Sequence, residues 1–261
     1  MIPLCRRSLI ISALFLFTAS RWAIAPGLPV QAWIVWNVGQ GQWVTWAKEN
    51  HCLHFDMGGE MWPKQALKKI CGSRQNQLFL THGDWDHINK IKEALSVLPS
   101  LCLHSAPLHM LSPLKKTLIN MIPVCHQLVH KVTRLYSPPP PSANPRQSTN
   151  ANSTVFTAGQ KMLVPGDSLK AQERIWSQQL DSISKVRWLI AGHHGSHTST
   201  SDPLLRRLPK LKQVIVSARK EKYGHPHNQV KARLQKLKIP MLQTELWGNI
   251  FLMENSKLKS D

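Results

Sequence analysis

Acidic residues are scarce in this sequence: 14 Asp and Glu stand against 33 Lys and Arg, a formal net charge of +19 over 261 residues. The basic residues are spread along the chain, so no single run accounts for the excess. A surplus of this size favours polyanions, namely nucleic acid, phosphate esters or an anionic membrane surface. On charge alone, a solvated basic surface is an equal alternative.

The five cysteines include no C-x-x-C pair, and this excludes a zinc finger. Cys5 lies near the N-terminus, and the others are Cys52, Cys71, Cys102 and Cys125. We expect these four to be ordinary buried thiols. Disulfides in an oxidising compartment are the alternative, although their pairing cannot be read from the sequence.

The apolar run Leu9–Thr18 is shorter than the roughly 20 residues that a membrane-spanning helix needs. Two arginines precede it and Ala23-Ile24-Ala25 follows it, which is typical of a targeting segment. We therefore expect residues 1–25 to be a signal peptide or an N-terminal membrane anchor, and residues 26–261 to form one folded domain. Either outcome predicts an exported protein, periplasmic or anchored with its domain outside the cytoplasm. A buried N-terminal helix is the alternative.

Short apolar segments alternate with helical ones, and 42% hydrophobic residues allow one sizeable core. Strands are expected at Ala32–Val38, Trp43–Ala47, Cys52–Phe55, Leu78–Leu80, Leu101–His104, Thr154–Thr157, Lys161–Val164, Val186–Ile190, Gln213–Ser217, Pro240–Gln243 and Glu245–Met253. Helices are expected at Pro63–Ile70, Ile88–Leu98, Leu114–Met121, Leu169–Leu180 and Gln229–Leu237. The Pro-rich segment Ser137–Asn152 is expected to be an exposed loop. The pattern predicts an α/β fold with two packed sheets and outer helices.

Histidine and aspartate cluster directly after these strands. His82, Asp84, Asp86 and His87 lie within six residues. Alternate residues of a loop can point to one side, so His82 and Asp84 could hold one ion while Asp86 and His87 face a second. Imidazole nitrogen and carboxylate oxygen suit zinc, manganese or iron. Packing alone rarely requires four such side chains so close together.

Further polar residues follow later strands. They are Asp167, the adjacent His193 and His194, and His225 and His227 on either side of Pro226. Strand ends at one edge of a sheet can converge in space. Asp167 could bridge two metals or only cap the following helix, and His225 and His227 could contact a phosphate or only shape a loop.

These motifs resemble those of the metallo-β-lactamase domain of ComEC/Rec2-type competence proteins, from about Ala32 to Met253. The matching segments are Asn37–Gln42 for D-V-G-Q-G-D, Asp56–Gly59 for D-T-G-G, His82–His87 for H-x-D-x-D-H, Asn150–Val155 for N-D-N-S-x-V, Gly166-Asp167 for T-G-D, His193–Ser196 for H-H-G-S and Tyr223–Pro226 for Y-G-H-P.

The resemblance implies a metallo-β-lactamase αββα sandwich that hydrolyses DNA phosphodiesters with two divalent metal ions, zinc or manganese. His82 and Asp84 would hold one ion, and Asp86, His87 and His193 the other, with Asp167 bridging. The implied catalytic residues are Asp86, Asp167, His194 and His225, and the implied substrate contacts are Ser196, Tyr223, Lys222 and His225. The implied partners are DNA, preferably single-stranded, or another phosphodiester, together with a competence-type channel and, through the N-terminus, a membrane.

Two departures from the family pattern leave other functions open. Asn37 and Gln42 replace both carboxylates of the first motif, and the additional histidine ligand of many superfamily members has only His126 and His130 as positional candidates. One alternative is a hydrolase of small esters, lactams or thioesters on the same fold. The other is a degenerate domain that binds DNA or an envelope partner without catalysis.

Overall fold

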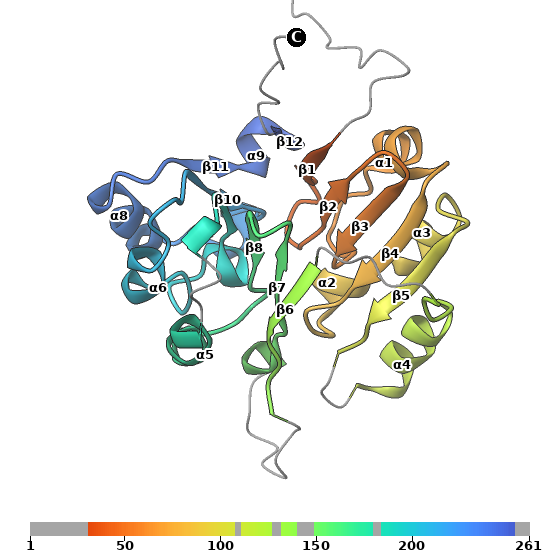
Figure 1. The fold of residues 1–261 in the computed structure, drawn as a ribbon, viewed down its shortest axis with the longest axis horizontal. Coiled ribbons are helices and arrows are strands. Elements are labelled where there is room, and N and C mark those ends of the chain that lie inside the picture. The colour runs from red at the N-terminus through yellow and green to blue at the C-terminus, as the bar shows by residue number, and fades with distance from the viewer. Residues whose placement is uncertain (1–30, 108–110, 127–131, 140–148, 180–183, 254–261) are drawn as a thin grey trace, which may run out of the picture.

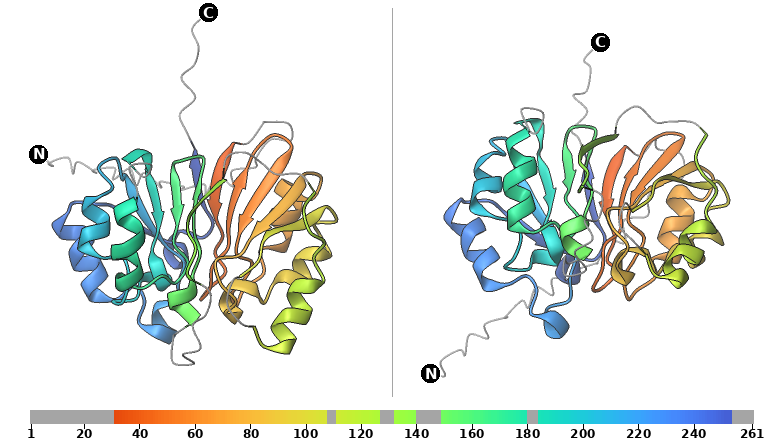
Figure 2. Two further views of the ribbon diagram at one scale, coloured as in Figure 1. Left: turned by 60° about the horizontal axis from the view of Figure 1, so that its bottom comes forward. Right: turned by 90° about the horizontal axis from the view of Figure 1, so that it is seen from below.

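The computed structural model describes residues 31–107, 111–126, 132–139, 149–179 and 184–253. The predicted targeting segment, residues 1–25, lies outside them. Two six-stranded sheets pack face to face, with helices on the outer face of each, as Figures 1 and 2 show. The predicted αββα sandwich is therefore confirmed. Among the described residues, none of the helices has the length and apolar character needed to cross a bilayer.

The first sheet has the strand order β12-β1-β2-β3-β4-β5. Its strands are β1 (Ala32–Val35), β2 (Val44–Ala47), β3 (His51–Phe55), β4 (Gln75–Phe79), β5 (Leu101–Ser105) and β12 (Ile250–Met253). The predicted antiparallel meander of β1 to β3 is confirmed, and β4 and β5 continue the sheet in parallel. The helices of this half are α1 (Lys64–Cys71), α2 (Trp85–Ile88), α3 (Ile91–Leu95) and α4 (Pro113–Asn120).

The second sheet has the order β11-β10-β9-β8-β7-β6. Its strands are β6 (Val132–Tyr136), β7 (Val155–Ala158), β8 (Met162–Val164), β9 (Trp188–Ile190), β10 (Gln213–Val216) and β11 (Met241–Gln243). The predicted hairpin of β7 and β8 is confirmed, while β8, β9 and β10 are parallel. The helices here are α5 (Lys170–Trp176), α6 (Asp202–Arg206), α7 (Lys220–Tyr223), α8 (Asn228–Lys236) and α9 (Thr244–Trp247).

Aromatic side chains fill the space between the sheets. Trp33 of β1 stacks on Trp46 of β2 with ring centroids 5.3 Å apart and also meets Trp188 of β9 at 4.9 Å. Phe79 of β4 contacts Phe156 of β7 across the same layer. Helices bury the outer face of most central strands, so these strands are apolar on both sides, which explains their continuous hydrophobic runs.

Two expectations about regular structure are wrong. The segment Glu245–Met253 is not one strand, because Gly248 adopts a left-handed conformation (φ 70°) that ends α9 before β12 begins. The described end of the expected Pro-rich loop, Thr149–Asn152, is a short 3-10 helix in which Ala151 and Asn152 are buried. This helix brings polar side chains towards the site described below.

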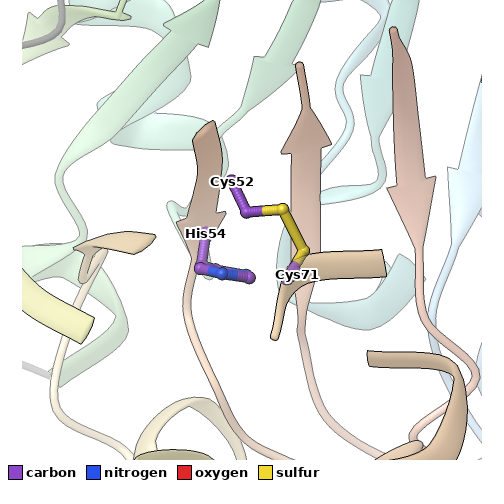
Figure 3. A group of neighbouring side chains, drawn as sticks. All are labelled: Cys52, His54 and Cys71. Atoms are coloured by element: carbon purple, nitrogen blue, oxygen red, sulfur yellow. A yellow bond between two sulfur atoms is a disulfide. The ribbon is translucent and has the colours of Figure 1, made fainter. Parts of the chain in front are cut away.

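The expectation of free buried thiols is also wrong. Cys52 of β3 is bonded to Cys71 of α1, and Cys102 of β5 is bonded to Cys125. Figure 3 shows the first disulfide beside His54. Both bonds lie in the half that contains the first sheet. Their formation requires an oxidising environment.

The carboxyl ends of the central strands lie at one edge of the sandwich. In the first sheet, β1 and β3 both run antiparallel to β2, and β4 is parallel to β3. In the second, β8, β9 and β10 run in the same direction. The segments that follow these strands carry the histidine and aspartate motifs, so the fold delivers them to a common place.

Candidate metal centre

Three segments supply the polar side chains, one from the first sheet and two from the second. Residues 81–87 follow β4 of the first sheet. Asp167 follows β8, and His193 and His194 follow β9, all in the second sheet. These side chains approach one another across the sandwich, with nitrogen and oxygen atoms 3.2 and 3.8 Å apart, although His87 and Asp167 are 80 positions apart in the sequence.

A first ligand group consists of His82, Asp84, Asp167 and His193. His82 Nε2 lies 3.5 Å from Asp84 Oδ2 and 3.8 Å from Asp167 Oδ2. His193 Nε2 lies 3.8 Å from the same Asp167 oxygen. These nitrogen and oxygen donors lie around His82 Nε2 and Asp167 Oδ2, and donors of both kinds suit a divalent cation.

A second ligand group consists of Asp86, His87, His194 and the other oxygen of Asp167. His87 Nε2 lies 3.2 Å from both His194 Nε2 and Asp167 Oδ1. His194 Nε2 lies 3.1 Å from Asp86 Oδ2 and 3.6 Å from Asp167 Oδ1. The Asp167 carboxylate thus presents one oxygen to each group, which is the placement expected of a bridging ligand.

The two adjacent histidines differ from the expected arrangement, in which His193 was a metal ligand and His194 a catalytic residue. The sequence reading put His193 with Asp86 and His87, but the structure puts His194 there and turns His193 towards His82. Both residues have left-handed backbone conformations, with φ 48° and 53°. Such φ values cost non-glycine residues on the order of 1 kcal/mol each, and this strain is typical of functional sites.

Hydrogen bonds on the far side of the His87 and His194 rings leave the nitrogens that face the centre available to bind a cation. His87 Nδ1 donates to Asp56 Oδ2 (2.7 Å) and His194 Nδ1 donates to the Ser217 carbonyl (2.9 Å), so each neutral ring has its lone pair on Nε2. Among the described residues, His82 Nε2 and Asp167 Oδ1 are buried without a hydrogen-bond partner. A bound cation would satisfy these atoms, so the donor set fits a pair of metals.

Asp56 organises the histidines from behind. Its Oδ2 accepts hydrogen bonds from His87 Nδ1, Thr81 Oγ1 and Gln42 Nε2, each at 2.7 Å. Because Thr81 Oγ1 donates to Asp56, it can accept from His82 Nδ1 at 3.0 Å. One buried carboxylate therefore fixes the orientation of a histidine in each ligand group.

Charge interactions hold the central carboxylates ionised. Burial alone would raise the pKa of Asp86, but the hydrogen bond with His194 and the charges of His87 and His194 lower it to about 2. Burial likewise opposes ionisation of Asp167, yet the charges of His87 and His194 hold its pKa well below the usual range. Against burial, Asp167 and Asp56 raise the pKa of His87. The site attracts protons strongly, and a divalent cation would replace them.

The turns after β1 and β3 form backbone hydrogen bonds with the segment His82–His87, which carries metal donors. Gln42 N donates to the Asp86 carbonyl at 2.9 Å, and Met57 N donates to the His87 carbonyl at 2.8 Å. A Cβ atom on Gly58 would lie 2.3 Å from the Asp86 carbonyl and the His87 nitrogen. Glycine at position 58 therefore permits the close backbone contact that positions Asp86 and His87.

No family model matches this chain, but two known proteins are similar to parts of it. ComE operon protein 3 of Bacillus subtilis is 29% identical over 113 residues, 42% of this chain and 14% of that protein. Recombination protein 2 of Haemophilus influenzae is 33% identical over 89 residues, 34% of this chain and 11% of that protein. The chain matches only a small part of either relative.

The solved metallo-β-lactamase fold protein YhfI from Bacillus subtilis has a TM-score of 0.50 at 11% identity, covering 81% of this chain and 96% of YhfI. At this identity the likeness concerns the fold. The chain is therefore similar to ComEC-family relatives over part of its length and has a metallo-β-lactamase fold. Its histidine and aspartate groups could hold divalent ions.

The other residues expected at the site differ in their exposure. Ser196 is buried and bonds to Thr198 Oγ1, which in turn contacts His193 Nδ1 at 3.1 Å, so Ser196 supports that ring from behind. The His225 ring lies 6.1 Å from the His193 ring. Tyr223 is exposed, and Lys222 Nζ pairs with Glu60 at 2.9 Å.

The structure also bears on three open questions from the sequence: whether Asp167 caps a helix, whether His227 only shapes a loop, and whether His126 or His130 is an additional ligand. Asp167 does not cap α5, because Leu169 occupies the N-cap position. His227 does cap a helix, accepting from Gln229 N at the start of α8. His126 lies beside Cys125 near the amino ends of β4 and β5, at the edge away from the metal centre, so it is not the additional ligand. His130 lies outside the described residues.

A further His and Cys grouping is structural. Cys52 and Cys71 lie near His54, but their sulfurs are joined, as Figure 3 shows. Trp43 Nε1 donates to His54 Nδ1, and His54 Nε2 contacts Asn76 Oδ1 at 2.9 Å. Both ring nitrogens are satisfied, so this histidine belongs to the core of the domain.

Sequence reasoning missed the residues that orient the ligands. Asp56 was noted only as part of a turn, and Thr81, Thr198 and Ser217 carry no motif of their own. The one available signal was an aspartate at the end of a buried strand, directly before residues that form a tight turn. A buried carboxylate in that position needs partners, and here histidine and threonine supply them.

Proposed function

We propose that this chain is a metal-dependent phosphodiesterase that cleaves DNA outside the cytoplasm. The observation that carries the proposal is the convergence of donors from both sheets on two points bridged by Asp167. The unpartnered buried atoms His82 Nε2 and Asp167 Oδ1, as far as the described residues go, support a metal pair there. The nitrogen and oxygen donors suit zinc or manganese.

Two divalent ions at these points would supply Lewis acidity and lower the pKa of a water molecule towards neutrality. The chain's own residues orient the reaction. The Asp86 side chain is 36% exposed, so it is accessible from solvent, and its low pKa of about 2 keeps it ionised. It can therefore accept a hydrogen bond from the attacking water and direct it towards phosphorus.

His225 is suited to contact the phosphate. Burial lowers its pKa to about 4, and the neighbouring charges of His194 and His193 act in the same direction. The ring is neutral at physiological pH, and its Nδ1 is buried without a partner among the described residues. A neutral imidazole can donate one hydrogen bond to a phosphoryl oxygen, where negative charge develops in the transition state.

DNA is favoured as the substrate by charge and by the relatives. The net charge of +19 attracts a polyanion. Arg219 and Lys222 are half-exposed around Glu60, close in sequence to His225. Relatives named for the ComE operon and for recombination support a role beside DNA uptake, with a competence-type channel as partner. The two disulfides support export to the periplasm or to the outer side of a membrane anchor.

The altered first motif does not by itself favour a degenerate domain. Gln42 donates to Asp56 Oδ2 and so reinforces the carboxylate that orients His87. The backbone N–H of Asn37 donates a hydrogen bond to Asn249 Oδ1 at 2.9 Å. Neither residue occupies a ligand position, so the metal donors are complete without the missing carboxylates.

The test is cleavage after metal removal and reloading. The full chain is stripped with a chelator, reloaded with zinc or manganese, and supplied with single-stranded DNA, duplex DNA, bis-(p-nitrophenyl) phosphate, a lactam and a thioester. We expect metal-dependent cleavage of DNA and the phosphate diester. Asp86→Ala and Asp167→Ala should each reduce it at least about a hundredfold.

Glu93→Ala is the control, because Glu93 is an exposed carboxylate on α3 that pairs with Lys90. It should leave cleavage unchanged. Turnover of only the lactam or thioester would favour the small-substrate hydrolase. Salt-sensitive DNA binding by a protein that takes up no metal would favour the degenerate domain.

A further inference from the structure

Trp85 stands out in the segment that carries the metal donors. His82 and His87 are fully buried, yet Trp85 is 44% exposed. The indole therefore presents a large part of its surface to solvent. Trp85 lies between Asp84 of the first ligand group and Asp86 of the second. The backbone of Trp85 is therefore held between the two ligand groups.

Lys115 of α4 brings a positive charge to the same ring. Its Nζ lies 5.5 Å from the Trp85 ring centroid and 3.4 Å from Asp84 Oδ1. The contact with Asp84, together with the hydrogen bond from Thr149 Oγ1 to Asp84 Oδ2, ties this lysine to the metal centre. An aromatic face with an adjacent ammonium group is the combination that binds a nucleobase and its phosphate together.

We propose that Trp85 and Lys115 form a stacking subsite for an unpaired base next to the phosphodiester that enters the metal centre. The inference rests on the proposed function and adds a selection for single-stranded DNA. A duplex keeps its bases paired and stacked on one another, so they cannot reach the indole. Every base has an aromatic face, so the subsite accepts any sequence.

A second aromatic and lysine pair approaches the centre from the other sheet. Tyr223 at the end of α7 is 51% exposed, and Lys222 Nζ lies 5.1 Å from its ring centroid. The Tyr223 ring lies 6.3 Å from His225 at an interplanar angle of 28°. Exposed rings thus flank the centre from both halves, as a strand passing across it with its bases turned outward would require.

The test is equilibrium binding of a labelled oligothymidylate to the metal-stripped full chain, followed by fluorescence anisotropy so that no cleavage intervenes. Trp85→Ala should weaken single-strand binding roughly 5- to 100-fold, the range for loss of one stacked base. Binding of a blunt duplex should change by less than about twofold, because it relies on phosphates. Trp85→Phe should restore most of the single-strand affinity, and Trp85→Leu should not.

Two controls separate stacking from a structural effect. Phe251→Ala removes another exposed ring, 38% exposed on β12 of the first sheet, and should leave binding unchanged. An oligonucleotide in which abasic sites replace the bases should bind wild type and Trp85→Ala equally. An equal loss on single strand, duplex and abasic oligomer would overturn the inference, as would unchanged single-strand binding in Trp85→Ala.

Cleavage by the metal-loaded chain distinguishes this inference from the proposed function. Trp85-dependent single-strand binding by a protein that cleaves no DNA would sustain the subsite and reject the phosphodiesterase. If Asp167→Ala abolishes DNA cleavage and Trp85→Ala leaves the cleavage of single-stranded and duplex DNA unchanged, the phosphodiesterase is supported and the stacking subsite is rejected.

Discussion

Gln42 Nε2 donates a hydrogen bond of 2.7 Å to Asp56 Oδ2 at the back of the metal centre. The same oxygen already accepts from Thr81 and His87. The amide therefore adds a third donor to the carboxylate that orients the histidines. A carboxylate at position 42, as the resembled motif carries, would instead place a second negative charge against Asp56 unless the pair shared a proton.

Gln42→Glu should make stability depend on pH. In the folded variant the introduced carboxyl keeps its proton beside Asp56, so its pKa lies above the unfolded value of about 4.3. The folded variant then binds more protons than the unfolded chain. Its free energy of unfolding relative to wild type therefore falls as the pH rises from about 4.3 through the raised pKa. Above that pKa the loss is constant at about 3 kcal/mol. Urea unfolding of the metal-free proteins between pH 4 and pH 8 measures this difference. Gln42→Ala should show a loss that does not vary with pH, and identical pH profiles for both variants would contradict the argument.

His193→Ala and His194→Ala should each remove one metal position and spare the other. The two rings belong to different ligand groups that share Asp167, so bound metal should fall from about two ions per chain to about one in either variant, and further in Asp167→Ala. Elemental analysis after dialysis gives the count. His197→Ala alters an exposed neighbour in the same loop and should keep the full complement. Loss of both ions in one single variant and none in the other would reject the two-group assignment.

His54 should make folding sensitive to mild acid. Burial lowers its pKa from 6.5 to about 4, against the opposing effect of its hydrogen bond with Asn76. Between pH 4 and pH 6.5 the His54 side chain is protonated in the unfolded chain and neutral in the folded one. The contribution of His54 to the free energy of unfolding therefore rises with pH from about 4 to 6.5 and is constant above 6.5. The shift corresponds to about 3 kcal/mol.

His54→Gln should flatten that rise in urea unfolding across the same pH range. His51→Gln, on the same strand at a half-buried position, should keep it. Equal slopes in the two variants would show that other groups cause the acid sensitivity.

The second disulfide should stabilise the half-domain that carries the β4 segment. Cys102 and Cys125 are 23 residues apart in the sequence, and neither is fully buried, so serine is tolerated at both. Replacing both with serine should lower the free energy of unfolding by about 3 kcal/mol. Urea unfolding with and without a reducing agent measures this loss, and a wild-type protein indifferent to reduction would contradict it.

Sequence reasoning reached the architecture and most of the donors because both leave periodic or clustered signals. Apolar runs ended by His82–His87, Asp167 and His193-His194 mark strand ends at one edge, and parallel strands bring such ends together. It could not assign the adjacent histidines to their ligand groups. That assignment depends on left-handed backbone conformations, which no residue pattern at His193 and His194 announces.

Contacts between residues far apart in the sequence could not be predicted either. The disulfides follow from which strands lie side by side, and four cysteines allow three connectivities. The hydrogen bonds of Asp56 depend on the approach of Gln42, Thr81 and His87 from separate segments. The exposure of Trp85 is likewise a tertiary property, since its position inside a metal motif gave no reason to expect an open ring.

Neither sheet of the sandwich holds a complete set of donors: Asp167, His193 and His194 come from one half, and the residues around His82 come from the other. Metal uptake and the docking of the two halves are therefore coupled parts of one equilibrium. Bound metal would therefore stabilise the contact between the two sheets at this edge, and chelation would weaken it.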